Sequence, residues 1–252
     1  MRDISADILR STHDTISIRY ISSGQAKQTE LALYAGTSLN IYRFRVNENE
    51  RSYKLLDENI GYVTLATIKR EDIKAIKKTF KNTNGIIIDI RNYPSTFVPY
   101  RLGKYFVSKI LTPFAKWTRG NVNNPGEFTF RSMGAGIGKL NRKTYKGKLV
   151  VLVNEYSQSQ AEYTAMAFRA GINTTIIGST TAGADGNVSN ISLPGGLRTA
   201  ISGVGVYYPD GTQTQRIGIV PDIWVEPTIE GIKQGKDELL EKAIEIIVSA
   251  EK

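Results

Sequence analysis

Ser159 stands where a nucleophile would be useful. An apolar run typical of a buried strand, residues 148–153, is followed by a polar loop and by a helical pattern over residues 160–170, which places Ser159 at the helix's first turn. There a hydroxyl lies beside unpaired backbone N–H groups and the positive end of the helix dipole, which could hold the oxyanion of an acyl-transfer reaction. Ser159-x-x-Glu162 also fits a capping box, whose two side chains only satisfy the helix end. Both interpretations stay open on spacing alone.

The composition excludes several other chemistries. With no cysteine, the chain has no disulfide, no thiolate nucleophile and no cysteine-based metal site. One histidine, His13, is too few for an all-histidine metal site or a multi-histidine proton relay. Residues 183–187 offer one Asp and one Asn, fewer oxygen ligands than calcium takes, and are expected to form a turn over the active site.

The elements that would position Ser159 alternate between strand and helix, which predicts an α/β core with a mainly parallel, covered sheet. Residues 111–140, rich in glycine, are expected to be a long loop that could cover a site. The predicted strands are residues 60–65, 85–90, 148–153, 175–177, 191–193, 199–202 and 204–208, and the predicted helices are residues 71–80, 100–110, 160–170 and 237–248.

The first fifty residues follow a different pattern. A short helix is predicted over residues 5–11, and strands over residues 15–20 and 28–34, on either side of a turn at Gly24. This order is what the back half of a small β-rich module would show, so we expect the chain to be a piece of a longer protein. The expected division is residues 1–50 as that module and linker, and residues 51–252 as the core.

Positive charge is concentrated in the first half. Residues 1–150 hold 26 Lys and Arg against 12 Asp and Glu, and the densest stretch is residues 139–148. Such a stretch could bind nucleic acid or an anionic membrane surface, but it lacks the interleaved aromatic side chains of single-strand binders, and a solvated loop is the simpler interpretation. No apolar run approaches the ~20 residues of a membrane-spanning helix.

Four segments together resemble the tail-specific proteases, also called C-terminal processing peptidases, and their tricorn-type relatives. The Ser159 segment, residues 157–162, is similar to the family's nucleophile segment. The other three are similar to its Asp-Leu-Arg-Asn-Asn-Pro-Gly-Gly turn, its Gly-x-x-Thr-x-Gly-Lys loop and its Gly-x-x-Pro-Asp-x-x-Val segment. In chain order the four read IDIRNYPS (88–95), SQSQAE (157–162), IGSTTAGA (177–184) and GIVPDIWV (218–225).

The resemblance implies a serine peptidase core of the crotonase or ClpP-like α/β type, preceded by a PDZ-like module of which residues 1–50 would be the end. It implies Ser159 as nucleophile, with oxyanion donors at the Gln160 backbone N–H and at the turn of Ser95. It implies no metal and no cofactor.

The base that the resemblance implies is missing from these motifs. Ala184 occupies the place of the family's lysine, and Gln215 stands near the glutamate of the tricorn branch, where it could orient the site. His13 matches no catalytic position, so the base is expected upstream of this chain. The paired glycines of the first turn are replaced by Ser95 and Thr96.

Two functions therefore follow as expectations. One is a serine endopeptidase of the tail-specific type, acting on peptide or protein substrates through an acyl-enzyme on Ser159. The other is a non-catalytic relative that binds extended peptides. No nucleic-acid partner and no membrane-spanning segment are expected. The resemblance implies a location in the periplasm or cell envelope.

Overall fold

The computed structural model describes residues 11–35, 49–107, 111–121, 123–124, 127–130, 134–138 and 144–250. The chain divides into two compact units, Met1–Asn47 and Glu48–Lys252. None of the described helices is long and apolar enough to cross a membrane.

The first unit contains an antiparallel hairpin of strands β1 (Thr15–Ser22) and β2 (Gln25–Ala32). Ser23 and Gly24 turn the chain with φ of 53° and 75°, the positive values that tight two-residue hairpin loops use. Both predicted strands are confirmed, although the second begins and ends earlier than expected. The helix expected over residues 5–11 lies outside the described residues except for its last residue, and the PDZ-like assignment stays a prediction.

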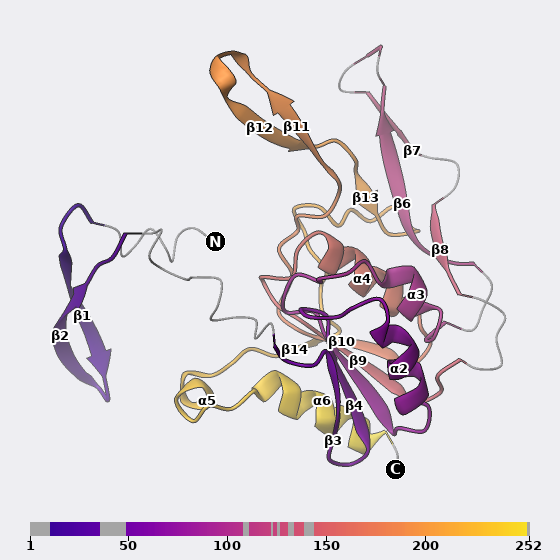
Figure 1. Cartoon of the computed structure of the whole chain (residues 1–252), viewed down its shortest axis with the longest axis horizontal. Coiled ribbons are helices and arrows are strands. Elements are labelled where there is room, and N and C mark those ends of the chain that lie inside the picture. Colours follow the sequence, from indigo (N-terminus) through magenta and orange to yellow (C-terminus); the bar gives the residue numbers. More distant parts are fainter. Residues whose placement is uncertain are drawn as a thin grey trace. The chain divides into compact units, whose positions relative to one another are not determined.

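A six-stranded sheet in the order β14-β10-β9-β5-β4-β3 forms the centre of the second unit (Figure 1). Five strands run parallel, and only the edge strand β3 pairs antiparallel, with β4. This confirms the predicted α/β class with a mainly parallel sheet. The strands are β3 (Tyr53–Leu56), β4 (Ile60–Thr64), β5 (Gly85–Asp89), β9 (Lys148–Val153), β10 (Thr174–Gly178) and β14 (Ile223–Trp224).

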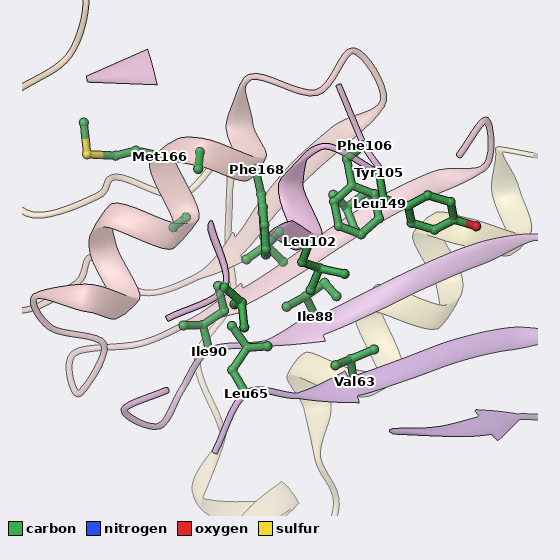
Figure 2. Packing of buried hydrophobic residues seen from close by; sticks show 14 of the residues in the cluster. Val63, Leu65, Ile88, Ile90, Leu102, Tyr105, Phe106, Leu149, Met166 and Phe168 are labelled. Carbon is green, nitrogen blue, oxygen red and sulfur yellow. The ribbon is translucent and has the colours of Figure 1, made fainter. Parts of the chain in front are cut away.

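Helices cover both faces of this sheet. On one face, side chains of α2 (Asp72–Thr79), α3 (Pro99–Gly103) and α4 (Gln160–Arg169) join the larger core cluster, whose packing around Ile88, Leu102 and Phe168 is drawn in Figure 2. On the other face, α6 (Glu238–Ser249) packs Ala243 and Ile247 onto the sheet. Because both faces are buried, the central strands are apolar throughout, as the sequence shows. A short helix, α5 (Ile229–Lys233), precedes α6.

Two predictions in the middle of the chain are wrong. Within the expected loop over residues 111–140, most of the described residues fold into strands, because β6 pairs with the distant β13 as well as with its neighbours β7 and β8. The helix expected over residues 100–110 ends at Gly103, where the bonds of the following turn span three residues, as in Tyr105 N–H to Leu102 O at 2.9 Å. The strands that the sequence did not predict are β6 (Thr112–Gly120), β7 (Phe128–Phe130) and β8 (Ala135–Ile137). The strands predicted over residues 191–193, 199–202 and 204–208 are present with shifted bounds as β11 (Val188–Ser192), β12 (Arg198–Ser202) and β13 (Val206–Tyr207), and a short 3-10 turn, η2 (Pro194–Gly196), joins β11 and β12.

An ion-pair clamp fixes the carboxyl end of β5 to the start of α6. The Arg91 guanidinium donates to both carboxylates of Asp89 and Asp237, at 2.6–3.2 Å. Asp237 also accepts from the Leu240 N–H and so caps α6. Arg91 and Asp89 thus form a structural ion pair at the end of this strand.

Candidate active site

Two serines follow strand β9, and the structure separates their roles. The Ser157 side chain is fully buried, and its hydroxyl donates to Ile90 O at 2.8 Å and accepts from the Asn154 N–H at 3.1 Å. Ser157 therefore pins the loop to the end of β5. Ser159, at the N-cap of α4, is partly exposed and lines a cavity. Of the two serines, Ser159 is the one that lines the cavity.

The backbone at Ser159 is strained. Its φ is 53° and its ψ is −113°, a region that non-glycine residues rarely occupy and that costs of order 1–3 kcal/mol. The chain thus turns sharply from loop into helix and presents the side chain at the bend. The same strand-turn-helix strain is used by the nucleophile elbows of α/β-hydrolases, here without the flanking glycines.

Glu162 holds this strained turn in place. Its carboxylate is fully buried and accepts four hydrogen bonds, two on each oxygen. Oε2 accepts from the N–H groups of Ser159, at 2.9 Å, and Ala184, at 3.0 Å. Oε1 accepts from the Thr181 hydroxyl, at 2.6 Å, and the Gly183 N–H, at 2.8 Å. The expected capping contact from Glu162 to Ser159 is present, and the same carboxylate also joins α4 to the loop after β10, which the sequence did not indicate.

Hydrogen bonds also join the segment of residues 218–225 and the loop of residues 181–184 to the Ser159 turn. Thr181 Oγ1 accepts from the Ile219 N–H at 2.6 Å, and the Ala182 N–H donates to Ser157 O at 3.0 Å. Gly183 adopts a φ of 65°, and a Cβ there would approach the Arg216 backbone to 2.9 Å, so only glycine fits without a shift. The segments around residues 159, 183 and 219 are therefore one packed unit.

The two expected oxyanion donors differ in availability. The Gln160 N–H opens α4 beside Ser159, and none of the described residues accepts a hydrogen bond from it. The Ser95 N–H instead donates to Leu65 O at 2.9 Å, and its hydroxyl donates to Ile68 O at 2.7 Å. In this conformation Ser95 is therefore a loop anchor, and its N–H is not free to bind an oxyanion as expected, because a carbonyl already occupies it.

Gln215, expected to orient the site, contacts backbone carbonyls near it, and its orienting role stays a prediction. Its Nε2 donates to Asp185 O at 2.8 Å and to Val204 O at 2.9 Å. It thereby ties the loop containing Asp185 to the segment entering β13. The sequence predicted its vicinity to the site, while this bridging geometry comes from the structure.

The cavity that contains Ser159 has a volume of about 690 Å³, within the range of ligand pockets. Its wall is strongly aromatic. Tyr163 stacks on Phe97 and on Trp117, each with ring centroids 6.2 Å apart, and its hydroxyl lies 2.8 Å from that of Tyr100. Arg119 and the Asp185–Asn187 turn also line the cavity, which agrees with the expectation that residues 183–187 turn over the site.

Asp185 is the unusual charged group of this cavity. The side chain is buried, Oδ1 accepts from the Gly186 N–H at 2.7 Å, and Oδ2 is buried without a donor among the described residues. Burial raises the pKa of Asp185 to about 7; the Glu162 charge adds to the rise and the Gly186 N–H opposes it. Sequence reasoning assigned this residue only to a turn, and its place beside the family's lysine position was the available signal.

Other candidates lie apart from this constellation. His13 belongs to the first unit and is exposed. Within the described ranges, no group of three or more His, Cys, Asp and Glu side chains could hold a metal ion. Half of the basic stretch, residues 139–143, lies outside the described residues, so the nucleic-acid alternative is untested.

Similarity to known proteins identifies the family of this chain. The model of peptidase family S41 matches residues 59–225. A candidate peptidase from Parabacteroides merdae is 25% identical, with a TM-score of 0.67; the match covers 77% of this chain and 63% of the Parabacteroides chain. Mature CPAF in complex with lactacystin is 15% identical, with a TM-score of 0.66; the match covers 93% of this chain and 67% of the CPAF chain. The photosystem II D1 C-terminal processing protease is 19% identical, with a TM-score of 0.50; the match covers 84% of this chain and 56% of the protease chain. The comparison with curated proteins gave no match.

The latter two similarities show the fold alone, and the chain spans about 63% of the length of the Parabacteroides protein. The family model covers well over half of this chain and includes Ser159, Glu162 and Asp185. The chain belongs to peptidase family S41, the serine peptidases that its four motifs resemble.

Proposed function

We propose that this chain is a serine endopeptidase of the tail-specific, C-terminal processing type, which hydrolyses peptide bonds through an acyl-enzyme on Ser159. The observation that carries the proposal is Ser159 itself, held in a strained turn at a helix N-terminus and facing an aromatic cavity. Strain at a non-glycine residue persists only where the surroundings enforce it, and here Glu162 enforces it.

In this mechanism the Ser159 hydroxyl attacks the carbonyl carbon of the scissile peptide. The Gln160 N–H supports the developing oxyanion from the first turn of α4, where the helix dipole also favours negative charge. The aromatic wall around Tyr163 holds apolar side chains of the substrate. Ala184, at the family's lysine position, has no group that takes a proton, so a lysine dyad does not operate here.

Labelling with a fluorophosphonate tests the nucleophile, because the reagent bonds covalently to activated serines. We expect one adduct on the intact protein, located at Ser159 by peptide mass analysis and absent from Ser159→Ala. The matched control is Ser192→Ala, an exposed serine on β11 outside the cavity, which should label like the wild type. Equal labelling of the wild type and Ser159→Ala would refute the proposal.

Arg119 supports the C-terminal part of the proposal. It is the cationic side chain among the described cavity-lining residues, and a guanidinium pairs well with a free carboxylate. Arg119→Gln should raise KM for peptides with a free C-terminus and leave KM for their C-terminal amides unchanged. Lys116→Gln, a charge removal on the same strand outside the cavity, is the control. An equal effect on acids and amides would remove the tail-specific assignment.

A non-catalytic peptide-binding relative is the second candidate, favoured by Ala184 and by the occupied Ser95 N–H. Its expected signature is a change in Trp117 fluorescence on adding peptide, measured in a Trp224→Phe background, without labelling or turnover. The resemblance to tail-specific proteases also supports a location in the periplasm or cell envelope, which cell fractionation would test.

A further inference from the structure

Asp185 combines burial, an unused acceptor and a place in the cavity of Ser159. Its side chain is 4% exposed, and the single hydrogen bond at Oδ1, from the Gly186 N–H, leaves Oδ2 without a donor in the part of the chain that the structure describes. An unpaired buried carboxylate oxygen is costly, so its retention calls for a proton or a donor that arrives during function.

The backbone on both sides of Asp185 is fixed close to Ser159. The Ala184 N–H and the Ser159 N–H share Glu162 Oε2, so their nitrogens can lie no farther apart than these two hydrogen bonds laid end to end. On the other side, Asp185 O accepts from Gln215 Nε2. Asp185 and Ser159 both line the same cavity. The backbone of Asp185 is therefore held near the serine, and the two residues share one cavity.

The groups around Asp185 allow its carboxyl group to titrate near neutral pH. Glu162 faces it from α4 with a like charge, and Tyr163 faces it from the next position of that helix. Arg119 lies on the cavity wall, and no Lys, Arg or His among the described residues forms an ion pair with Asp185. With its pKa raised to about 7 by burial, the group can take up and return a proton at neutral pH.

Other groups near the serine cannot serve as the base. Both oxygens of Glu162 are occupied by four donors, and a glutamine amide such as that of Gln215 does not accept a proton at neutral pH. Tyr163 holds its proton, because burial and the Tyr100 hydroxyl raise its pKa. A guanidinium remains protonated. Asp185 is the remaining acceptor among the described residues that line the cavity.

We propose that Asp185 is the general base for Ser159, so that nucleophile and base lie together within this chain. This inference rests on the proposed function. It differs from the expectation that the base lies upstream.

The proton follows a closed path. The Asp185 carboxylate takes the proton of the Ser159 hydroxyl, directly or through one water, as Oγ bonds to the scissile carbonyl carbon and the C=O electron pair moves onto oxygen. When the tetrahedral intermediate collapses, the C–N bond breaks and the leaving amine takes the proton from Asp185. In deacylation, Asp185 takes a proton from the attacking water and returns it to Ser159 Oγ, which releases the carboxylic acid and the free enzyme.

The test measures the second-order rate of fluorophosphonate labelling of the 252-residue chain between pH 5 and 9. We expect the wild-type rate to rise through a midpoint near pH 7, and Asp185→Asn to lower the plateau about 10²–10⁴-fold and abolish the midpoint. Asp210→Asn is the matched control, since Asp210 also accepts a following backbone N–H, from Thr212, but is exposed and outside the cavity. Asp185→Ala should regain rate with added formate, which a structural defect would not.

The outcomes are separable. Labelling that needs Ser159 but has the same rate and pH midpoint in Asp185→Asn overturns the inference and leaves the proposed function standing. A flat wild-type profile overturns it without any variant, should Asp185→Asn fail to fold. Absence of labelling that depends on Ser159 overturns both. Formate rescue of Asp185→Ala together with the lost midpoint supports the inference.

Discussion

Replacing Glu162 by glutamine should release the turn that presents Ser159. The change keeps the shape of the side chain but turns one oxygen into an NH₂ group, which donates instead of accepting. Because each carboxylate oxygen receives two donors, either orientation of the amide leaves two donors without an acceptor. A flip of the amide therefore cannot repair the site.

The expected cost follows from those two orphaned donors. Each buried donor left unsatisfied costs about 1–3 kcal/mol, so Glu162→Gln should lose about 2–6 kcal/mol. That loss is large beside a typical domain stability of about 5–15 kcal/mol but does not abolish folding in most of this range. The release should be local first, because all four donors belong to the turn at Ser159 and the loop of residues 181–184.

Hydrogen exchange read by mass spectrometry measures this directly. In Glu162→Gln, peptides that contain the amides of Gly183 and Ala184 should exchange faster by at least tenfold, and guanidinium unfolding should occur at a lower midpoint. Glu155→Gln is the matched control, since Glu155 lies in the loop that precedes α4, is exposed and accepts one bond, from the Ser179 hydroxyl. Unchanged exchange at these amides, with less than about 1 kcal/mol of destabilisation, would refute the proposed role of Glu162.

Three further predictions concern strain, protonation and the clamp on α6. Ser159→Gly should raise the free energy of unfolding by about 1 kcal/mol while abolishing labelling, because glycine accepts a positive φ; destabilisation on guanidinium unfolding would contradict this. Since the pKa of Asp185 is about 7 in the folded state, above the ordinary carboxyl value, its burial costs stability as pH rises from about 4 through 7. The free energy of unfolding of the wild type minus that of Asp185→Asn should therefore fall over that window. A difference that is independent of pH would exclude the raised pKa. Arg91→Met leaves the buried Asp89 without its cation and should cost about 3–5 kcal/mol by chemical unfolding, whereas a neutral result would show that the clamp is dispensable.

Local sequence patterns were sufficient for the core of the fold. The strands β4, β5 and β9 and the helices α2, α4 and α6 lie within one or two residues of their predicted bounds. Each is buried by the sheet or by a helix face along its own length, so apolar period and run length carry the information. The loop predicted over residues 111–140 failed because β6 gains its partner β13 from residues about ninety positions later, which no local window contains.

The sequence by itself determined the α/β class, the position of Ser159 at a helix start, and the kinship that the family match confirms. Tertiary structure decided which groups surround that serine. Glu162 accepts four hydrogen bonds from two segments that lie apart in the sequence. The Ser95 N–H donates to Leu65 O, and Asp185 is a buried acceptor with one oxygen unused. Hydrogen-bond partners and burial depend on the packing of segments far apart in the chain, so spacing along the sequence could not reveal them.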